Sequence, residues 1–374
     1  MTATLRIVLD QVTSPTDPDL AVASAQLARA LIDTAPAGCE VAALIPAAPA
    51  SDVEDLQHRL PGLSAVDRAA LPSRRLAAAW QVGVPAGAGG GLIHSPTLMA
   101  PLVRHDRAHD HDQTIVTLWD LDAWEHPGEH PRTSVAWQKG MLRRAARYAD
   151  AVIVPTHAAA ARVGELANLG ERIRVMSGAA PADFRVPADE VGRRRELGIP
   201  EGCLLVSGSA APSTGLGVAF EAIARHGGDL PIVVIDAPEG GEPAIADLAA
   251  AAGVPERRLH VRTALAPVDR AAVFGGAVTF LAPSTRTHFP WRVVEALRLG
   301  VPLVAAGSDV HREVIVDGGV IVEPDDVDAF AAAIGAALGS AEAAERLGVL
   351  AADRGRAFSW AGAAERVWQL HADL

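Results

Sequence analysis

The feature that most constrains the fold is a regular alternation of two kinds of segment. Short runs of β-branched and apolar residues are separated by longer segments rich in Ala, Leu and Arg, whose apolar residues recur with the period of a helix. This alternation is typical of βα units, which place their strands side by side in a parallel sheet. It predicts an α/β protein built from doubly wound parallel sheets.

The alternation occurs twice along the 374 residues, which are also too many for one ordinary core. The predicted strands of the first half are LRIVLD, EVAALIP, LIHSP, TIVTLWD, AVIVPTH and RIRVMSG. Those of the second half are CLLVSGSA, PIVVIDA, RLHVRTA, AVTFLAPS, VPLVAAG and GVIVEP. Two series of this kind predict two Rossmann-like domains.

Residues 177–202 separate the two series, because Gly, Pro and charged residues replace the periodic apolar ones there. We expect a first domain over residues 1–180 and a second over residues 181–355. In open α/β sheets ligands bind outside the carboxyl ends of the strands. We therefore expect the two domains to face a cleft, with functional residues in the loops that follow strands.

Composition narrows the classes of partner. The net charge of −12 disfavours nucleic acid, because a phosphate backbone is held by surplus Lys and Arg. Basic residues are almost all arginine, with Lys139 the single lysine, and alanine is abundant, which indicates a compositional bias of the source genome. The two cysteines, Cys39 and Cys203, favour neither a disulfide framework nor a cysteine metal site and fit a cytoplasmic compartment.

The N-terminus and the length of the apolar runs indicate how the chain could meet a membrane. The N-terminus MTATLRIVLDQV has the pattern of a first strand and not of a signal peptide. No run approaches the roughly 20 apolar residues of a membrane span, so any membrane contact would be peripheral. The helix predicted over residues 137–150 offers a basic face for such contact, although a solvated face is the favoured interpretation. Its basic residues are Lys139, Arg143, Arg144 and Arg147.

Three further segments resemble a known family. They are ERIRVMSGAAPADFRVP at the domain crossover, RLGVPLVAAGSDVHREVIVDGGVIVEPDDVDAFAAAI, and the tail FSWAGAAERVWQLHADL. With these motifs in this order, the chain resembles a divergent member of the retaining glycosyltransferases of family 4, which have the GT-B fold of two Rossmann-like domains. The resemblance implies that residues 356–374 form a helix crossing back to the first domain. It also implies a nucleoside diphosphate sugar as co-substrate, with no metal and no other cofactor.

The family carries a pair of glutamates with seven residues between them. Glu295, in VVEALRLG, corresponds to the second glutamate, and the resemblance implies that its carboxylate accepts hydrogen bonds from a ribose. The alternative is an exposed glutamate stabilised by the helix N-terminus. Thr287 occupies the position of the first glutamate, and the Gly-Phe-Gly that usually follows reads His288-Phe289-Pro290.

The loop expected to hold the diphosphate departs from the family in the same way. The family's Gly-Arg…Lys-Gly reads SGSAAPSTGLG here, with Ser209 and Thr214 in place of the two cations. Gly208 and Gly215 remain, and a glycine turn that opens a helix can cradle phosphate through backbone N–H groups. Genome bias does not explain this loss, because an arginine-rich chain would be expected to carry Arg at position 214.

The segment around Thr287 offers substitutes for the lost cations. Arg286 and Arg292 flank it, and arginine can bind a diphosphate in a bidentate way. The alternative places Arg292 on the outer face of its helix and leaves Arg286 solvated. His288 could add a proton donor. The remaining donor-site candidates are Arg262, Ser284 and Phe289.

The first domain also differs from the family pattern. Family members often carry His-Asp after a strand, near the reacting sugar, and TIVTLWDLDAW has Trp119 and Asp120 there. With Arg292, these are the catalytic candidates. The glycine-rich acceptor loop that usually follows the first strand is missing, since the corresponding segment reads DQVTSPTDPDL.

Two patterns could indicate a metal. Asp120-Leu121-Asp122 matches a metal–diphosphate motif of another glycosyltransferase fold, but the strand order favours the metal-independent one. His105, His109 and His111 lie among aspartates, and zinc binds such residues, although a solvated loop is the favoured interpretation. No metal site is therefore predicted.

Two functions from different classes stay open. The first is transfer of a hexosyl group from a nucleoside diphosphate sugar to an unknown acceptor, through a degenerate diphosphate site. The second is a non-catalytic GT-B protein that binds a nucleotide, a sugar or a partner glycosyltransferase. Because the cations that stabilise the leaving group are replaced, we expect weak or absent turnover with UDP-glucose and GDP-mannose.

Overall fold

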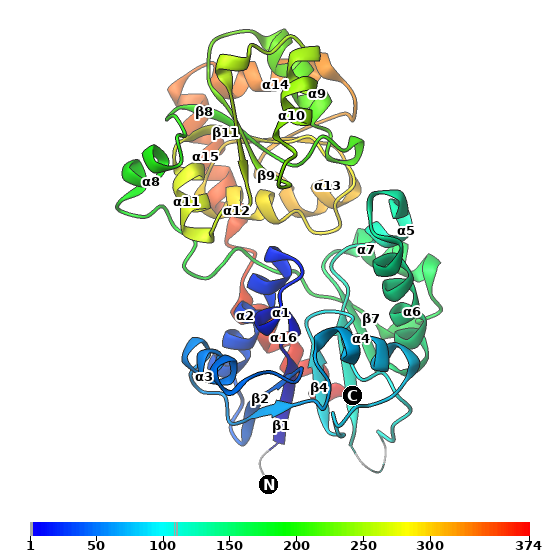
Figure 1. The fold of residues 1–374 in the computed structure, drawn as a ribbon. Coiled ribbons are helices and arrows are strands. Elements are labelled where there is room, and N and C mark those ends of the chain that lie inside the picture. The colour runs from blue at the N-terminus through cyan, green and yellow to red at the C-terminus, as the bar shows by residue number, and fades with distance from the viewer. Residues whose placement is uncertain (1–2, 108, 110) are drawn as a thin grey trace. The chain divides into compact units, whose positions relative to one another are not determined.

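The computed structural model describes residues 3–107, 109 and 111–374 and divides into two compact units (Figure 1). Unit 1 contains Met1–Gly178 and Ser359–Leu374, and unit 2 contains Ala179–Phe358. The end of the chain therefore belongs to unit 1. Each unit has a parallel sheet with helices on its faces.

Unit 1 is built on a seven-stranded parallel sheet in the order β3-β2-β1-β4-β5-β6-β7. Its strands are β1 (Ala3–Val8), β2 (Cys39–Ile45), β3 (Val66–Arg68), β4 (Leu92–Ser95), β5 (Gln113–Thr117), β6 (Ala151–Val154) and β7 (Ile173–Val175). The central strands β5 and β6 are buried along their whole length, and β6 is accordingly apolar throughout. The sequence analysis missed β3, a three-residue edge strand.

The helices of unit 1 cover both faces of this sheet. They are α1 (Asp10–Thr13), α2 (Pro18–Asp33), α3 (Ala50–Arg59), α4 (Ser73–Val82), α5 (Asp122–Glu125), α6 (Arg132–Tyr148), α7 (His157–Leu166) and α16 (Trp360–Asp373). Helix α2 begins at Pro18 because the Asp17 side chain accepts a hydrogen bond from the Leu20 N–H at 2.9 Å. Helix α16 packs on α2, where the Trp368 indole N–H donates to the Leu31 carbonyl oxygen at 3.1 Å.

Unit 2 is built on a six-stranded parallel sheet in the order β10-β9-β8-β11-β12-β13. Its strands are β8 (Cys203–Ser207), β9 (Ile232–Ala237), β10 (Leu259–Thr263), β11 (Ala277–Ala282), β12 (Leu303–Ala306) and β13 (Val320–Val322). These correspond one for one to the strands predicted from the second half of the sequence. The prediction of doubly wound parallel sheets is confirmed.

The helices of unit 2 enclose an aliphatic core with a few phenylalanines. They are α8 (Glu190–Glu196), α9 (Leu216–His226), α10 (Glu242–Ala251), α11 (Pro267–Gly275), α12 (Trp291–Leu299), α13 (Asp309–Ile315), α14 (Val327–Leu338) and α15 (Ala341–Gly355). Phe220 of α9 and Phe330 of α14 are buried in one cluster between these helices and the sheet. The helix α9 thereby fixes the loop that leads into it from β8.

Both sheets reverse their strand order beside their first strand. In unit 1, β1 lies between β2 and β4, and in unit 2, β8 lies between β9 and β11. Loops that leave neighbouring strands in opposite directions at such a point separate and leave room for a ligand. The carboxyl ends of β1 and β8 are therefore the expected ligand sites of the two units.

Among the described residues, no single helix is long and apolar enough to cross a membrane. One pair of helices, over residues 327–338 and 341–373 with a bend of 103°, passes the same test by length and composition only.

Candidate functional site

The loop between β8 and α9 keeps the two glycines of the expected phosphate-binding turn. Gly208 follows β8 with φ +138°, and Gly215 precedes α9 with φ +71°, a conformation that glycine adopts readily. A Cβ atom on Gly215 would lie 2.7 Å from the Pro283 carbonyl oxygen. Glycine is therefore required at position 215, where this loop contacts the loop that follows β11.

The helix that follows this loop has no side-chain cap among the residues that the structure describes, since Gly215 occupies the N-cap position. The first N–H groups of a helix lack partners within the helix and favour an anion. Within the turn, the N–H groups of Gly208, Thr214 and Gly215 donate to carbonyl oxygens, so the backbone donors suited to a phosphate group are the first N–H groups of α9.

The two residues that replace the expected cations stabilise the loop from within. The Thr214 hydroxyl lies 2.5 Å from the Ser209 carbonyl oxygen and 2.9 Å from the Ala211 carbonyl oxygen, and donates toward them. The Ser209 hydroxyl accepts a hydrogen bond from the Ala211 N–H at 3.2 Å. Both side chains shape the turn, and neither brings positive charge to it.

Ser284 connects this turn to the loop after β11. Its hydroxyl donates to the Ser213 carbonyl oxygen at 2.8 Å and accepts from the Arg286 N–H at 3.2 Å. Arg286 is exposed and Thr287 is half-buried. The structure therefore brings Ser284, Arg286 and the glycine turn together, as the candidate donor site requires.

The next two candidates of this segment, His288 and Phe289, are buried. The Phe289 ring packs edge-on against the Trp291 ring, with centroids 4.5 Å apart. These contacts fix the start of α12 and so the position of Glu295 one turn later.

Glu295 is held in a buried ion pair. Its carboxylate accepts two hydrogen bonds from Arg270 of α11, at 2.8 Å from Nε and 2.6 Å from Nη2. The two side chains are 3% and 4% exposed, so the alternative of an exposed helix glutamate is wrong. Whether the same carboxylate also binds a ribose stays a prediction.

Arg292 extends this pair into a network of four charges. Its guanidinium donates to Asp236 of β9 at 2.7 Å and 3.3 Å, and reaches Glu295 at 3.4 Å. The side chain is 11% exposed, so Arg292 does not lie on an outer helix face. Two arginines and two carboxylates balance each other, so the charge of Arg292 is already compensated.

Sequence analysis missed Asp236 and Arg270. Asp236 has φ +62°, a conformation that is uncommon outside glycine and is kept here beside the Arg292 guanidinium. The sequence did contain a sign of Asp236, because this aspartate interrupts the apolar run PIVVIDA near the carboxyl end of a predicted strand. Arg270 carried no such signal, since it lies within a helix.

Arg262 is not brought together with the other candidates. It extends from the edge strand β10, and its guanidinium donates to the carbonyl oxygens of Leu197 and Gly198 at 2.6 Å and 3.1 Å. These atoms lie at the end of α8. Arg262 therefore contacts the segment that connects α8 to β8.

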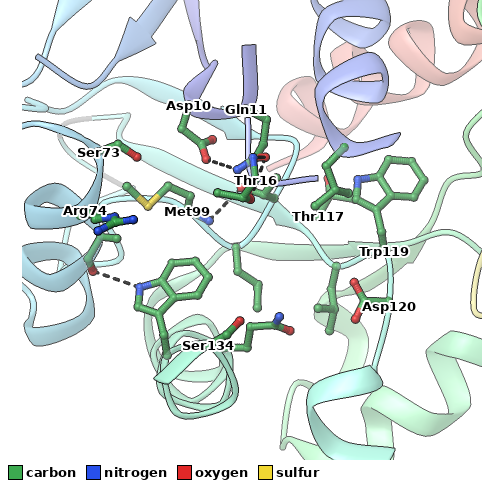
Figure 2. Close-up of a pocket in the computed structure, with 17 residues that line it drawn as sticks. Asp10, Gln11, Thr16, Ser73, Arg74, Met99, Thr117, Trp119, Asp120 and Ser134 are labelled. Carbon is green, nitrogen blue, oxygen red and sulfur yellow. Dashed lines mark hydrogen bonds between the residues drawn. The ribbon is translucent and has the colours of Figure 1, made fainter. Parts of the chain in front are cut away.

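The catalytic candidates of unit 1, Trp119 and Asp120, line a pocket of about 300 Å³ (Figure 2). The pocket lies at the carboxyl ends of β1, β4 and β5, between α4 and α6. The Trp119 indole N–H donates to the Pro96 carbonyl oxygen at 2.8 Å. Asp120 accepts a hydrogen bond from the Asp122 N–H at 3.1 Å, which orients its carboxylate.

Sequence analysis also missed Asp10 and Gln11, which line the same pocket. They belong to the short helix α1, at the position where a glycine-rich loop was expected from the resemblance. Asp10 is 5% exposed, and burial raises the pKa of its carboxyl to about 6. A buried acid directly after the first strand is a signal that only the structure shows.

The patterns that suggested a metal do not converge. Among the described residues, no group of three or more His, Cys, Asp or Glu side chains could hold a metal ion. His105 lies 2.8 Å from Asp150, a hydrogen bond that raises the pKa of the imidazole. Burial raises the pKa of Asp122 to about 6, and the negative charge of the nearby Asp120 contributes to this rise.

The basic helix predicted over residues 137–150 forms the main part of α6. Arg144 points inward, since its Nε donates to the Leu102 carbonyl oxygen at 3.0 Å. The guanidinium carbons of Arg144 and Arg147 lie 5.0 Å and 5.3 Å from the centroid of the Tyr148 ring. Lys139 and Arg143 line a separate shallow pocket. The four basic residues therefore do not form one continuous face.

Comparison with known proteins finds a family model that matches most of unit 2. Residues 194–353 match the model of the family described as glycosyl transferases group 1. The chain is 28% identical over 246 residues to D-inositol 3-phosphate glycosyltransferase of Nocardia farcinica, covering 60% of this chain and 54% of that protein. It is 23% identical over 251 residues to O-antigen chain mannosyltransferase B of Escherichia coli, covering 65% and 64%. The chain thus spans between half and two thirds of these relatives.

Solved structures match the whole chain in fold. Sucrose-phosphate synthase from Thermosynechococcus elongatus has a TM-score of 0.72 at 19% identity, covering 99% of this chain and 98% of that one. HepE of Anabaena, in complex with UDP-glucose, has a TM-score of 0.72 at 16% identity, covering 99% and 100%. Residues 194–353 thus match the group 1 glycosyl transferases, and the whole chain has the GT-B fold, as the resemblance in its sequence predicted.

Proposed function

We propose that the protein transfers a hexosyl group from a nucleoside diphosphate sugar to a hydroxyl-bearing acceptor, without a metal or another cofactor. The observation that carries this proposal is the glycine turn from Gly208 to Gly215, which lies within the domain that matches the family. The turn leads into α9, whose first N–H groups have no side-chain cap among the described residues, and Ser284 joins it to the loop after β11. A diphosphate placed there would meet backbone donors from a rigid loop.

Glu295 would bind the ribose in this arrangement. The carboxylate accepts two hydrogen bonds from Arg270 and a longer one from Arg292, and a ribose hydroxyl would share it with these donors. Because Arg270 fixes both oxygens, the carboxylate would be oriented before the nucleotide binds.

The donor sugar would lie beside the segment from Arg286 to Phe289, where Thr287 takes the place of a carboxylate. Arg286 is exposed and is the cation of this segment that could approach the leaving diphosphate. Arg292 would act through the network with Asp236 and Glu295, and its compensated charge limits what it can contribute. We therefore expect turnover with UDP-glucose and GDP-mannose to be weak.

The acceptor would bind in the pocket of unit 1, where Trp119 and Asp120 lie. The names of the relatives describe transfer to an inositol phosphate and to an O-antigen chain, and HepE was solved with UDP-glucose. These names support a nucleotide-sugar donor and a hydroxylated acceptor for this chain. A cytoplasmic location, with peripheral membrane contact through Lys139 and Arg143, is part of the proposal.

A second candidate function rests on the same loop. Ser209 and Thr214 supply no positive charge, and the Arg292 charge is balanced by Asp236. A pocket that binds nucleotide without stabilising the leaving group would suit a non-catalytic protein that supports a partner glycosyltransferase.

One experiment distinguishes the two candidates. Thermal unfolding is measured with nucleotides and nucleotide sugars, because a ligand at 100 times its Kd stabilises the folded state by about 2.7 kcal/mol. Nucleotide release is then measured with an acceptor panel. Stabilisation with release supports the transferase, stabilisation without release supports the non-catalytic protein, and no stabilisation by any nucleotide or nucleotide sugar refutes both.

A further inference from the structure

Asp10 has one carboxylate oxygen that is held in place and one that has no partner. Its Oδ2 accepts a hydrogen bond from the Gln11 Nε2 at 2.7 Å. Its Oδ1 is buried and finds no hydrogen-bond partner among the residues that the structure describes. Figure 2 shows the carboxyl group directed toward the space that the pocket residues enclose.

Gln11 is fixed from its other side. Its Oε1 accepts hydrogen bonds from both the N–H and the hydroxyl of Thr16, each at 3.0 Å. The amide therefore has its donor directed at Asp10 and its acceptor at Thr16. This chain of contacts holds the Asp10 carboxylate in one orientation, with Oδ1 left for another donor.

The charge state of Asp10 makes the missing donor costly. Burial raises the pKa of the carboxyl to about 6, so the group is mainly ionised at neutral pH. A buried ionised oxygen without a hydrogen bond is unfavourable, and a ligand that supplies the donor removes that cost. A hydroxyl group of a ligand is such a donor.

The pocket also presents carbon surface from two tryptophans. The Trp119 indole N–H donates to Pro96, and the Trp137 indole N–H donates to the Ala77 carbonyl oxygen at 3.1 Å. Since both N–H groups are used, the rings offer only apolar surface to a ligand. Apolar rings combined with convergent hydrogen-bonding groups suit a sugar ring, which has C–H faces and hydroxyl edges.

The charges around the pocket favour an uncharged ligand. Asp10 and Asp120 contribute two carboxylates, while Arg74 lies among the lining residues as an exposed cation that solvent screens. An anionic group would meet repulsion from the carboxylates. The pocket of about 300 Å³ is at the small end for ligand sites, which suits one ring better than an extended chain.

We propose that this pocket binds the acceptor as an uncharged, hydroxyl-rich ring, a monosaccharide unit or a cyclitol, and that Asp10 accepts a hydrogen bond from one of its hydroxyl groups. Gln11 is the positioning residue for this contact. The inference rests on the proposed function, because it names the acceptor class of the same enzyme.

The test measures binding to the full chain by ligand-observed NMR. The uncharged probes are methyl α-D-glucoside, methyl α-D-mannoside and myo-inositol, and the anionic probe is glucose 6-phosphate. The variants are Asp10→Asn, which keeps the size of the side chain, and Asp52→Asn, an exposed aspartate of α3 in the same unit, as the matched control. Gln11→Ala tests the positioning role and serves if Asp10→Asn does not fold.

We expect at least one uncharged probe to bind more tightly than glucose 6-phosphate. Its Kd should rise about tenfold or more in Asp10→Asn, the effect of losing a hydrogen bond to a charged group, and several-fold in Gln11→Ala. Asp52→Asn should leave it unchanged. Tighter binding of glucose 6-phosphate, no binding of any uncharged probe, or equal affinity in wild type and the folded variants would overturn the proposal.

Nucleotide-sugar binding is measured on the same samples. If a nucleotide sugar binds and no uncharged ring does, the acceptor class is wrong and the proposed function stands. If no nucleotide sugar binds, the proposed function fails on its own evidence.

Discussion

Removing the charge of Glu295 should destabilise unit 2, because it leaves a buried guanidinium without its partner. In Glu295→Gln, the amide keeps one acceptor for Arg270 and presents N–H groups where the second acceptor was. Arg270 is 4% exposed and sends two of its hydrogen bonds to Glu295. Removing one member of a buried pair costs about 3 to 5 kcal/mol, and we expect about 3 kcal/mol here because one hydrogen bond remains.

The measurement follows urea unfolding by hydrogen–deuterium exchange in peptides from α11 and α12, which isolates unit 2 from unit 1. The matched control is Arg225→Ala, which breaks the pair between Arg225 and Asp328, whose side chains are 53% and 78% exposed. An exposed pair contributes about 0 to 1 kcal/mol, so this variant should unfold nearly as the wild type does.

A third variant separates the ion pair from simple packing. Replacing Glu295 and Arg270 together by Leu and Met removes both buried charges, and such replacements are often close to neutral. The double variant should therefore be more stable than Glu295→Gln. If Glu295→Gln costs less than about 1 kcal/mol, or if the double variant is the least stable of the three, the buried pair does not hold α11 to α12.

The remaining predictions concern the glycine turn, the lost cations and the response to acid. Gly215→Ala should destabilise unit 2 by about 1 to 3 kcal/mol in urea unfolding, because φ is +71° and the new methyl group would meet Pro283; wild-type stability would contradict the required glycine. Ser209→Arg with Thr214→Lys should raise nucleotide-release rates by about 100-fold or more if missing charge limits turnover, and an unchanged rate would exclude that cause. Burial lowers the pKa of His371 to about 4 from 6.5, so the unfolded chain takes up the proton first as the pH falls. The stability from this group is complete above pH 6.5 and declines by about 3 kcal/mol toward pH 4. His371→Gln should flatten this part of the pH profile of unit 1, and an unchanged slope would show that His371 does not titrate differently on folding.

The fold was predictable because its strands are central and apolar. Runs such as CLLVSGSA and AVTFLAPS can be buried on both faces only within a covered parallel sheet, and they became β8 and β11. The strand β3 was not predicted, because Val66 is its only apolar residue and two of its three positions are exposed. An edge strand of that length has too few buried side chains to leave a pattern.

The site was predictable only where backbone geometry decides it. A glycine before a helix is visible in the sequence, and Gly215 proved to need its positive φ. The partners of charged residues are not visible, because Arg270 and Glu295 lie 25 positions apart and meet only when α11 and α12 pack. Asp10 was assigned only to the end of the predicted strand LRIVLD, since nothing in its neighbours shows that the fold buries it in a pocket.

The central claim is that unit 2 binds a nucleoside diphosphate sugar. The most direct measurement is isothermal titration calorimetry of the full chain with UDP-glucose, GDP-mannose and the corresponding nucleotides, in wild type, Glu295→Gln and Arg225→Ala. We expect saturable binding of at least one nucleotide sugar, weakened by about 1.5 to 3 kcal/mol in folded Glu295→Gln and unchanged in Arg225→Ala. No binding of any of these ligands to the folded wild-type chain, or equal affinity in all three proteins, would contradict the claim.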